Sequence, residues 1–130
     1  MRILIVDDHE TVRKGVRTIL ESRKDVEVCG EASNGQEAVE KTFQLKPDLI
    51  ILDVTMPVFG GFEAARRIKA TLPKIPILML SMHEGDFVIQ ESQLVGVQGY
   101  ISKSQAATAL LEAVDAVLRG DTFFPATPRH

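Results

Sequence analysis

The stretch ILIVDDHETV, residues 3–12, decides the fold, because it joins a run of branched aliphatic residues directly to two carboxylates, Asp7 and Asp8. A short, continuous apolar run of this kind is typical of a strand that is covered on both faces. Two like charges side by side cost free energy unless a cation lies between them. The stretch therefore predicts a buried strand that ends at a cation-binding site.

Similar apolar runs recur along the chain, and segments with helical periodicity separate them. The predicted strands cover residues 3–6, 26–32, 49–52, 77–80 and 98–101. The predicted apolar helix faces are Val12, Val16, Ile19 and Leu20; Ala38, Val39, Thr42 and Leu45; Ala64, Ala65, Ile68 and Leu72; Phe87, Val88, Glu91, Leu94 and Val95; and a last helix over residues 105–119. This alternation predicts an α/β, doubly wound (βα)5 fold, a three-layer sandwich around a five-stranded parallel sheet.

Composition narrows the class of protein. The chain has 130 residues, 45% of them hydrophobic, which fits one compact domain. Its net charge of −3 offers no basic surface for nucleic acid, and no run approaches the roughly 20 apolar residues that span a bilayer. The single cysteine, Cys29, cannot form an internal disulfide, and the start shows no signal-peptide pattern. We expect a cytoplasmic domain that neither enters a membrane nor binds DNA by itself.

Chemically active side chains follow four of the five predicted strands. They are Asp7 and Asp8 after the first, Asp53 after the third, Ser81 after the fourth and Lys103 after the fifth. Taken singly, each has an ordinary explanation as a helix cap, a turn residue or a solvated charge. In doubly wound sheets, however, ligands bind outside the carboxyl ends of the strands. The joint placement predicts one shared site.

Three carboxylates in one cleft suit a hard divalent cation that takes oxygen ligands and keeps some of its waters. The sequence therefore predicts a Mg²⁺ site. His9 follows the acidic pair directly, but a lone imidazole among hard oxygen ligands is more often a surface neighbour. We predict no metal role for His9.

Four segments, VDDHETVRKG, LDVTMPVFGG, ILMLSMH and GYISK, resemble the receiver domain of two-component response regulators. The resemblance covers nearly the whole chain. VDDH, VEVCGEASNGQEAVE and GYISK look like the NarL/FixJ branch, whose members usually carry a LuxR-type DNA-binding domain after the receiver. The resemblance implies a flavodoxin-like sheet with strand order 2-1-3-4-5 and a receiver over residues 1–120. Residues 121–130 would begin an interdomain linker or tail, and DNA would be reached only through an output domain absent from this chain.

The same resemblance assigns the chemistry. Asp53 would be the phosphoacceptor, a carboxylate that attacks the phosphohistidine of a sensor histidine kinase. The ligands of Mg²⁺ would be Asp7, Asp8, Asp53 and the backbone carbonyl of Thr55. Lys103 would pair with Asp53 at rest and then with a phosphoryl oxygen.

The resemblance also implies how phosphorylation would change the conformation of the domain. A phosphoryl group brings roughly −1.5 to −2 charge, which would pull the hydroxyl of Ser81 inward. Tyr100 occupies the position of the aromatic that turns inward in this family, so Ser81 and Tyr100 form the predicted switch. The domain would be a phosphoacceptor that controls an output such as transcription, not an enzyme, although it assists its own phosphorylation and dephosphorylation.

The last helix has more apolar surface than one sheet face requires. Its apolar residues cover an arc of roughly 160°, whereas about 100° is enough for packing on a sheet. The surplus lies around Ala107, Leu111 and Leu118. It favours a homodimer through this helix, with the first helix as a second contributor.

Three other functions are compatible with a fold of this class. A phosphohydrolase of the haloacid-dehalogenase kind needs Asp-x-Asp spacing, whereas Asp7 and Asp8 are adjacent. A flavin carrier with this fold would offer hydroxyls and free backbone donors in its first loop, where this chain has acids. A receiver-like adaptor that binds partners without phosphorylation stays open as the alternative, although the full set of acids, hydroxyl and lysine argues against it.

Overall fold

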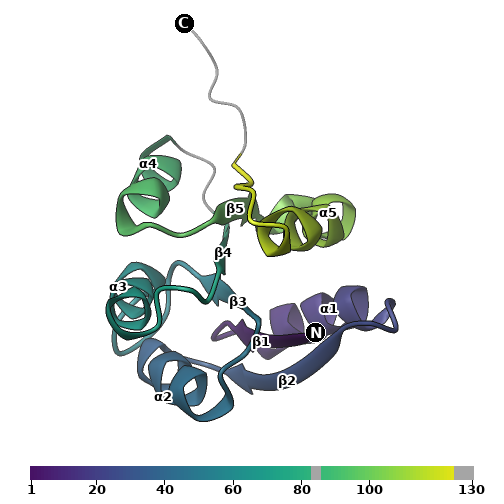
Figure 1. The fold of residues 1–130 in the computed structure, drawn as a ribbon, viewed down its shortest axis with the longest axis horizontal. Coiled ribbons are helices and arrows are strands. Elements are labelled where there is room, and N and C mark those ends of the chain that lie inside the picture. Colours follow the sequence, from purple (N-terminus) through teal and green to yellow (C-terminus); the bar gives the residue numbers. More distant parts are fainter. Residues whose placement is uncertain (83–85, 125–130) are drawn as a thin grey trace, which may run out of the picture.

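The computed structural model describes residues 1–82 and 86–124. Figure 1 shows a central sheet with helices on both faces. The strands are β1 (Arg2–Val6), β2 (Glu27–Ala32), β3 (Leu49–Asp53), β4 (Ile77–Ser81) and β5 (Gly99–Ser102). The helices are α1 (Glu10–Glu21), α2 (Gly35–Leu45), α3 (Gly61–Thr71), α4 (Asp86–Val95) and α5 (Ala106–Leu118), with a 3₁₀ turn, η1 (Lys103–Gln105), before α5.

The sheet has the order β2-β1-β3-β4-β5, and all its strand pairs are parallel. This confirms the predicted doubly wound fold and strand order. The chain steps outward from β1 to β2 and then returns to β3 on the other side of β1. The carboxyl ends of β1 and β3 therefore lie at the point where the strand order reverses, which is where ligands bind in such sheets.

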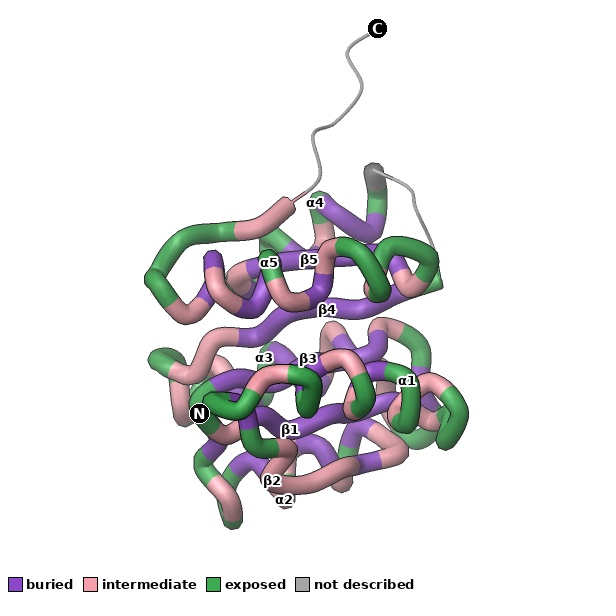
Figure 2. Tube along the Cα trace, turned by 90° about the vertical axis from the view of Figure 1, so that its right-hand side faces the viewer, coloured by how far each residue is buried: buried purple, intermediate pink, exposed green. Residues whose placement is uncertain are grey.

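Each face of the sheet packs against its own hydrophobic core. In β1, Leu4 and Val6 belong to the core under α2, α3 and α4, whereas Ile3 and Ile5 belong to the core under α1 and α5. This alternation follows from the two-residue period of a strand. Figure 2 shows β1, β3, β4 and β5 as a buried layer between partly exposed helices, whereas the edge strand β2 is only partly buried. No helix of the described residues is long and apolar enough to cross a bilayer.

The buried face of α4 differs from the prediction. Phe87 and Leu94, which were expected on it, are 72% and 81% exposed. The buried residues are Val88, as predicted, with Ile89 and Ser92, and Val95 packs against the core as a partly buried residue. Ser92 can be buried because its hydroxyl donates a hydrogen bond to the carbonyl of Val88 at 2.8 Å. The prediction was wrong for Phe87 and Leu94 and right for Val88 and Val95, and it did not include Ile89 and Ser92.

The apolar surplus on α5 is smaller than the sequence arc suggests. Leu111 and Leu118 are only half-exposed, since both pack against the core between the sheet and α1. Ala107 is exposed. The homodimer through this helix stays a prediction.

The segment after α5 returns to the edge of β5. Phe123 N donates to the carbonyl of Gln98 at 2.9 Å, and Tyr100 N donates to the carbonyl of Phe123 at 2.8 Å. The rings of Phe123 and Phe124 pack against the two different cores. Residues 121–124 thus cover an otherwise open strand edge. The rest of the predicted linker, residues 125–130, lies outside the described residues, and the domain boundary at residue 120 stays a prediction.

If the segment after α5 is part of the folded unit, shortening Phe123 will cost stability. We expect Phe123→Ala to lower the free energy of unfolding by about 1–3 kcal/mol, because a half-buried ring leaves the core. Phe87→Ala serves as the control, since that ring is 72% exposed, and should change stability by less than about 0.5 kcal/mol. Urea unfolding measures both. Equal effects would show that residues 121–124 are a loose tail.

Candidate functional site

Strand register brings the predicted site residues to one edge of the sheet. Val6 pairs with Leu52, which places Asp7 and Asp53 side by side at the ends of β1 and β3. Asp53 pairs with Leu80, so Ser81 lies one residue beyond it on β4. A cavity of about 410 Å³ opens there, lined by Asp8, His9, Asp53, Thr55, Met82 and Lys103.

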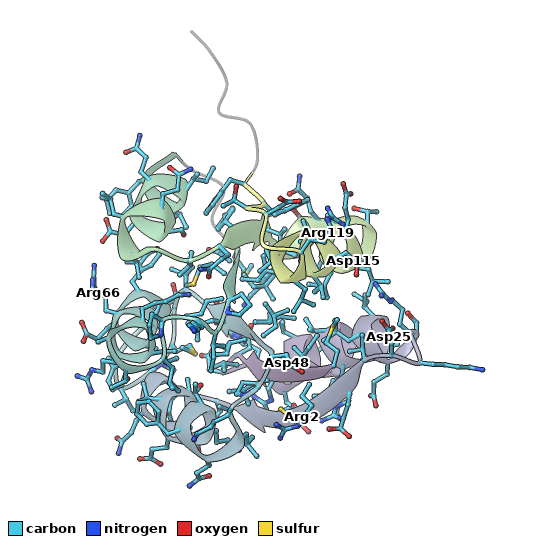
Figure 3. All side chains as sticks on the ribbon, in the orientation of Figure 1. Arg2, Asp25, Asp48, Arg66, Asp115 and Arg119 are labelled. Carbon is cyan, nitrogen blue, oxygen red and sulfur yellow. The ribbon has the colours of Figure 1, made fainter. Side chains whose placement is uncertain are left out.

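The opposite edge of the sheet carries charge of a different kind. Arg2 and Asp48, both labelled in Figure 3, lie at the amino-terminal ends of β1 and β3, where Arg2 N donates to Asp48 Oδ2 at 2.7 Å. This contact is exposed to solvent. By contrast, Asp7 and Asp53 are buried. Both edges of the sheet carry charged residues, but buried carboxylates lie at the edge formed by the carboxyl-terminal ends of the strands.

A single ammonium group lies between two buried carboxylates. Lys103 Nζ is 2.8 Å from Asp7 Oδ2 and 3.4 Å from Asp53 Oδ1. The resting contact with Asp53 is therefore present, but Asp7 is the closer partner. The lysine follows β5 directly, in η1, so the neighbouring strand positions its ammonium group.

The carboxyl of Asp53 is held in an unfavourable environment for a charge. Burial raises its pKa to about 6, and the nearby Asp7 carboxylate adds to the rise. Lys103 and the backbone N–H of Thr55, which donates to Asp53 Oδ1 at 3.4 Å, oppose this effect only in part. The site therefore carries more negative charge than its lysine neutralises.

The acidic residues fit a small, hard cation. Ligand atoms from Asp7, Asp8, His9 and Asp53 all lie within 4.8 Å of one another. Asp8 Oδ1 is buried and accepts no hydrogen bond from the described part of the chain, although the ring atom His9 Nδ1 lies 3.0 Å from it. A buried carboxylate oxygen without a donor is costly unless a cation or water fills the place beside it. The oxygen-rich set is of the kind that Mg²⁺ takes.

His9, for which no metal role is predicted, lies next to the carboxylates of Asp7 and Asp8. Its Nδ1 is 3.1 Å from Asp7 Oδ1 and 3.0 Å from Asp8 Oδ1, while 60% of the side chain is exposed. The backbone N–H of His9 also donates to Asp7 Oδ1 at 2.8 Å. His9 is the N-cap residue of α1, and this position turns its ring toward the preceding carboxylates. It borders the cavity from the solvent side.

The two predicted switch residues are both buried. Ser81 is 1% exposed at the end of β4, and Tyr100 is 2% exposed in the middle of β5. Tyr100 packs in the core under α2, α3 and α4. The inward rotation implied by the resemblance would require a second state with an exposed ring. The switch stays a prediction.

One structural requirement of the site was not foreseen. Gly61 begins α3 directly against the backbone of Asp53, where a Cβ atom would lie 2.0 Å from the carbonyl oxygen of Asp53. Gly61 N donates to the carbonyl of Val54 at 2.8 Å and so closes the loop. Only glycine allows this approach. The start of α3 thus supports the backbone that carries Asp53.

Comparison with known proteins identifies related chains. A family model of the response regulator receiver domain matches residues 3–115. The response regulator protein VraR of Staphylococcus aureus is 40% identical over 124 residues, which cover 95% of this chain and 59% of that protein. The chain thus spans about three fifths of the length of these relatives.

Solved structures share the fold. A two-component response regulator of the LuxR family from Aurantimonas sp. is 35% identical with a TM-score of 0.90, over 94% of this chain and 87% of that one. The non-phosphorylated receiver domain of the stress response regulator RcsB from Escherichia coli is 28% identical with a TM-score of 0.90, over 97% and 98% of the two chains.

The raised pKa of Asp53 makes a prediction about stability without metal. Ionising Asp53 costs nothing below about pH 3.8, its ordinary pKa, and the full penalty applies above about pH 6. Asp53→Asn should therefore stabilise the metal-free protein above pH 6 by up to about 3 kcal/mol, and this gain should vanish as the pH falls toward 4. Urea unfolding in EDTA across this range measures it. Glu112→Gln, an exposed carboxylate on α5, is the control. A gain that does not depend on pH would contradict the electrostatic explanation.

Proposed function

The chain belongs to the receiver domain family of response regulators, whose members are signalling domains, and on this premise we propose that it accepts a phosphoryl group on Asp53 in a Mg²⁺-dependent reaction. The donor is the phosphohistidine of a sensor histidine kinase. The observation that carries the proposal is the buried carboxylate of Asp53 beside the ammonium of Lys103, with the acidic oxygens of Asp7 and Asp8 close by.

Phosphoryl transfer at this site is a displacement at phosphorus. An oxygen of ionised Asp53 forms the new O–P bond, the N–P bond of the donor breaks, and its electron pair stays on the histidine nitrogen of the kinase. The product is an acyl phosphate. The groups that would hold Mg²⁺ are the carboxylates of Asp7, Asp8 and Asp53 and the carbonyl of Thr55. When bound, the cation supplies positive charge against the nucleophile and the incoming phosphoryl group.

Lys103 supplies the fixed positive charge on the protein's side. In the resting site its ammonium contacts Asp7 and Asp53. Once Asp53 carries a phosphoryl group, the same ammonium lies next to a phosphoryl oxygen, and charge that develops during transfer meets a cation already in place. The buried hydroxyl of Ser81 donates to another phosphoryl oxygen. The protein thus contributes positioning and electrostatics, both in phosphorylation and in the later loss of the group.

The signal passes from the site to partner proteins. Movement of Ser81 on β4 and of Tyr100 on the adjacent strand β5 reports the phosphorylated state to these partners. The chain covers 59% of the length of its relative VraR. We propose that a LuxR-type output domain outside this chain binds DNA, and that the protein acts in the cytoplasm. A groove lined by Val12, Gly15 and Ile19 of α1 and by Ala106 and Ala107 supports a homodimer through these two helices.

The alternative is an adaptor that uses the same surface without phosphorylation. It would keep the receiver fold and bind partners through α5 or α4. Burial of Asp53 beside Lys103 favours the phosphoacceptor, because an adaptor gains nothing from a carboxylate whose ionisation is costly.

Intact mass after incubation with Mg²⁺ and acetyl phosphate tests the proposal. We expect one phosphoryl group on the wild-type chain and on the Glu112→Gln control. No adduct should form on Asp53→Asn or when EDTA removes the metal. A folded wild-type chain that binds Mg²⁺ but takes no phosphoryl group would contradict the proposal and favour the adaptor. An adduct that persists in Asp53→Asn would move the acceptor to another residue.

A further inference from the structure

The backbone carbonyl of Asp7 needs a partner from outside the sheet. The last ladder pairs of β1 are Val6 with Ala32 and Val6 with Leu52. Asp7 N still donates to the carbonyl of Ala32 at 3.0 Å, but Asp7 lies beyond the paired residues. The residue is fully buried. A buried carbonyl at this place costs free energy unless a side chain donates to it.

Arg13 supplies that donor. Its Nη1 donates to the carbonyl of Asp7 at 2.6 Å. Arg13 lies in the first turns of α1, and its own N–H donates to the carbonyl of His9 at 3.1 Å. The side chain is 17% exposed. The guanidinium therefore reaches back from the helix to the residue whose carboxylate contacts Lys103.

Glu31 on β2 fixes the guanidinium in this orientation. Arg13 Nε donates to Glu31 Oε1 at 2.9 Å, while Arg17 donates to Glu31 Oε2 through Nε and Nη2 at 3.0 and 2.6 Å. Although burial alone would raise the pKa of Glu31, the hydrogen bonds from Arg17 and Arg13 hold it below its ordinary value. A forked guanidinium can bind the carboxylate and the carbonyl at once. The anchor also keeps Arg13 away from the carboxylates of the cavity.

We propose that Arg13 is a positioning residue for the Mg²⁺ site, acting through the backbone of Asp7. Metal ligands must be held within about 0.5 Å of their productive geometry, and the groups that orient them affect affinity strongly. Arg13 ties Asp7 to both α1 and β2, so the Asp7 carboxylate is presented in one orientation. Arg17 shares Glu31 but makes no hydrogen bond or ion pair with Asp7 within the described residues, and it provides a matched control. The inference rests on the proposed Mg²⁺-dependent function.

Mg²⁺ binding measured calorimetrically, without a phosphodonor, is the direct test. We expect Arg13→Ala to weaken Mg²⁺ binding about tenfold or more, the usual cost of losing a group that orients a ligand. Arg17→Ala should bind within about twofold of wild type, a change of less than about 0.4 kcal/mol. Urea unfolding measures the stability of both variants. If the arginines had a purely structural role, both variants would lose stability without a selective loss of Mg²⁺ affinity in Arg13→Ala.

Phosphorylation kinetics give a second readout. In Arg13→Ala the Mg²⁺ concentration for half-maximal phosphorylation by acetyl phosphate should rise, while the rate at saturating Mg²⁺ stays near wild type. Arg13→Lys covers the case in which Arg13→Ala does not fold. A lysine keeps the charge but lacks the two separate nitrogen atoms with which Arg13 reaches Glu31 and Asp7, so the Mg²⁺ affinity of this variant should also fall, to a smaller extent.

The outcomes separate the role of Arg13 from the metal site and from the proposed function. The positioning role is overturned if Arg13→Ala binds Mg²⁺ with wild-type affinity, or if Arg17→Ala loses as much affinity as Arg13→Ala. If the alanine variant is unfolded, wild-type affinity in Arg13→Lys overturns it. A wild-type chain that does not bind Mg²⁺ overturns it together with the metal site. A wild-type chain that binds Mg²⁺ but accepts no phosphoryl group overturns the proposed function alone, because the calorimetric comparison still tests Arg13.

Discussion

The contact of one partly buried ammonium, that of Lys103, with the carboxylates of Asp7 and Asp53 is the interaction on which the site depends. Buried carboxylates repel each other and lose the solvation of water, and one lysine offsets only part of this cost. The pKa of Asp53, raised to about 6, reflects that imbalance. The fold keeps the acids and Lys103 together because β1 and β3 end, and η1 begins, at the same edge of the sheet. An excess of buried negative charge of this kind favours the binding of a divalent cation, which is the basis of the proposed Mg²⁺ site.

Much of this arrangement could be predicted from the sequence. Continuous apolar runs such as Leu49–Leu52 indicate strands covered on both faces, and such strands have their carboxyl ends at one edge. Asp7, Asp53 and Lys103 could therefore be grouped before any geometry was known. The face of α4 could not, because burial of Ser92 depends on a hydrogen bond within the helix, which hydrophobic periodicity does not register.

Features that depend on a single backbone atom escaped prediction. Arg13 reads as an ordinary surface residue of an amphipathic helix, yet its guanidinium reaches a carbonyl six residues earlier. Gly61 has no distinctive sequence signal, yet it permits the close approach of α3 to the backbone of Asp53. His9 was excluded on residue type, whereas its position as N-cap places the ring beside Asp7 and Asp8. Each case needs the path of the backbone, which side-chain patterns do not supply.

The midpoint of thermal unfolding with and without Mg²⁺, at a pH above the value of about 6 for Asp53, tests the central claim most directly. A cation that binds only the folded chain and relieves the repulsion between the carboxylates must raise the midpoint. The account predicts a clear rise for the wild type and a smaller rise for Asp53→Asn, which has lost one ligand and one charge. A wild-type midpoint that Mg²⁺ leaves unchanged, or an equal rise in both proteins, would contradict it.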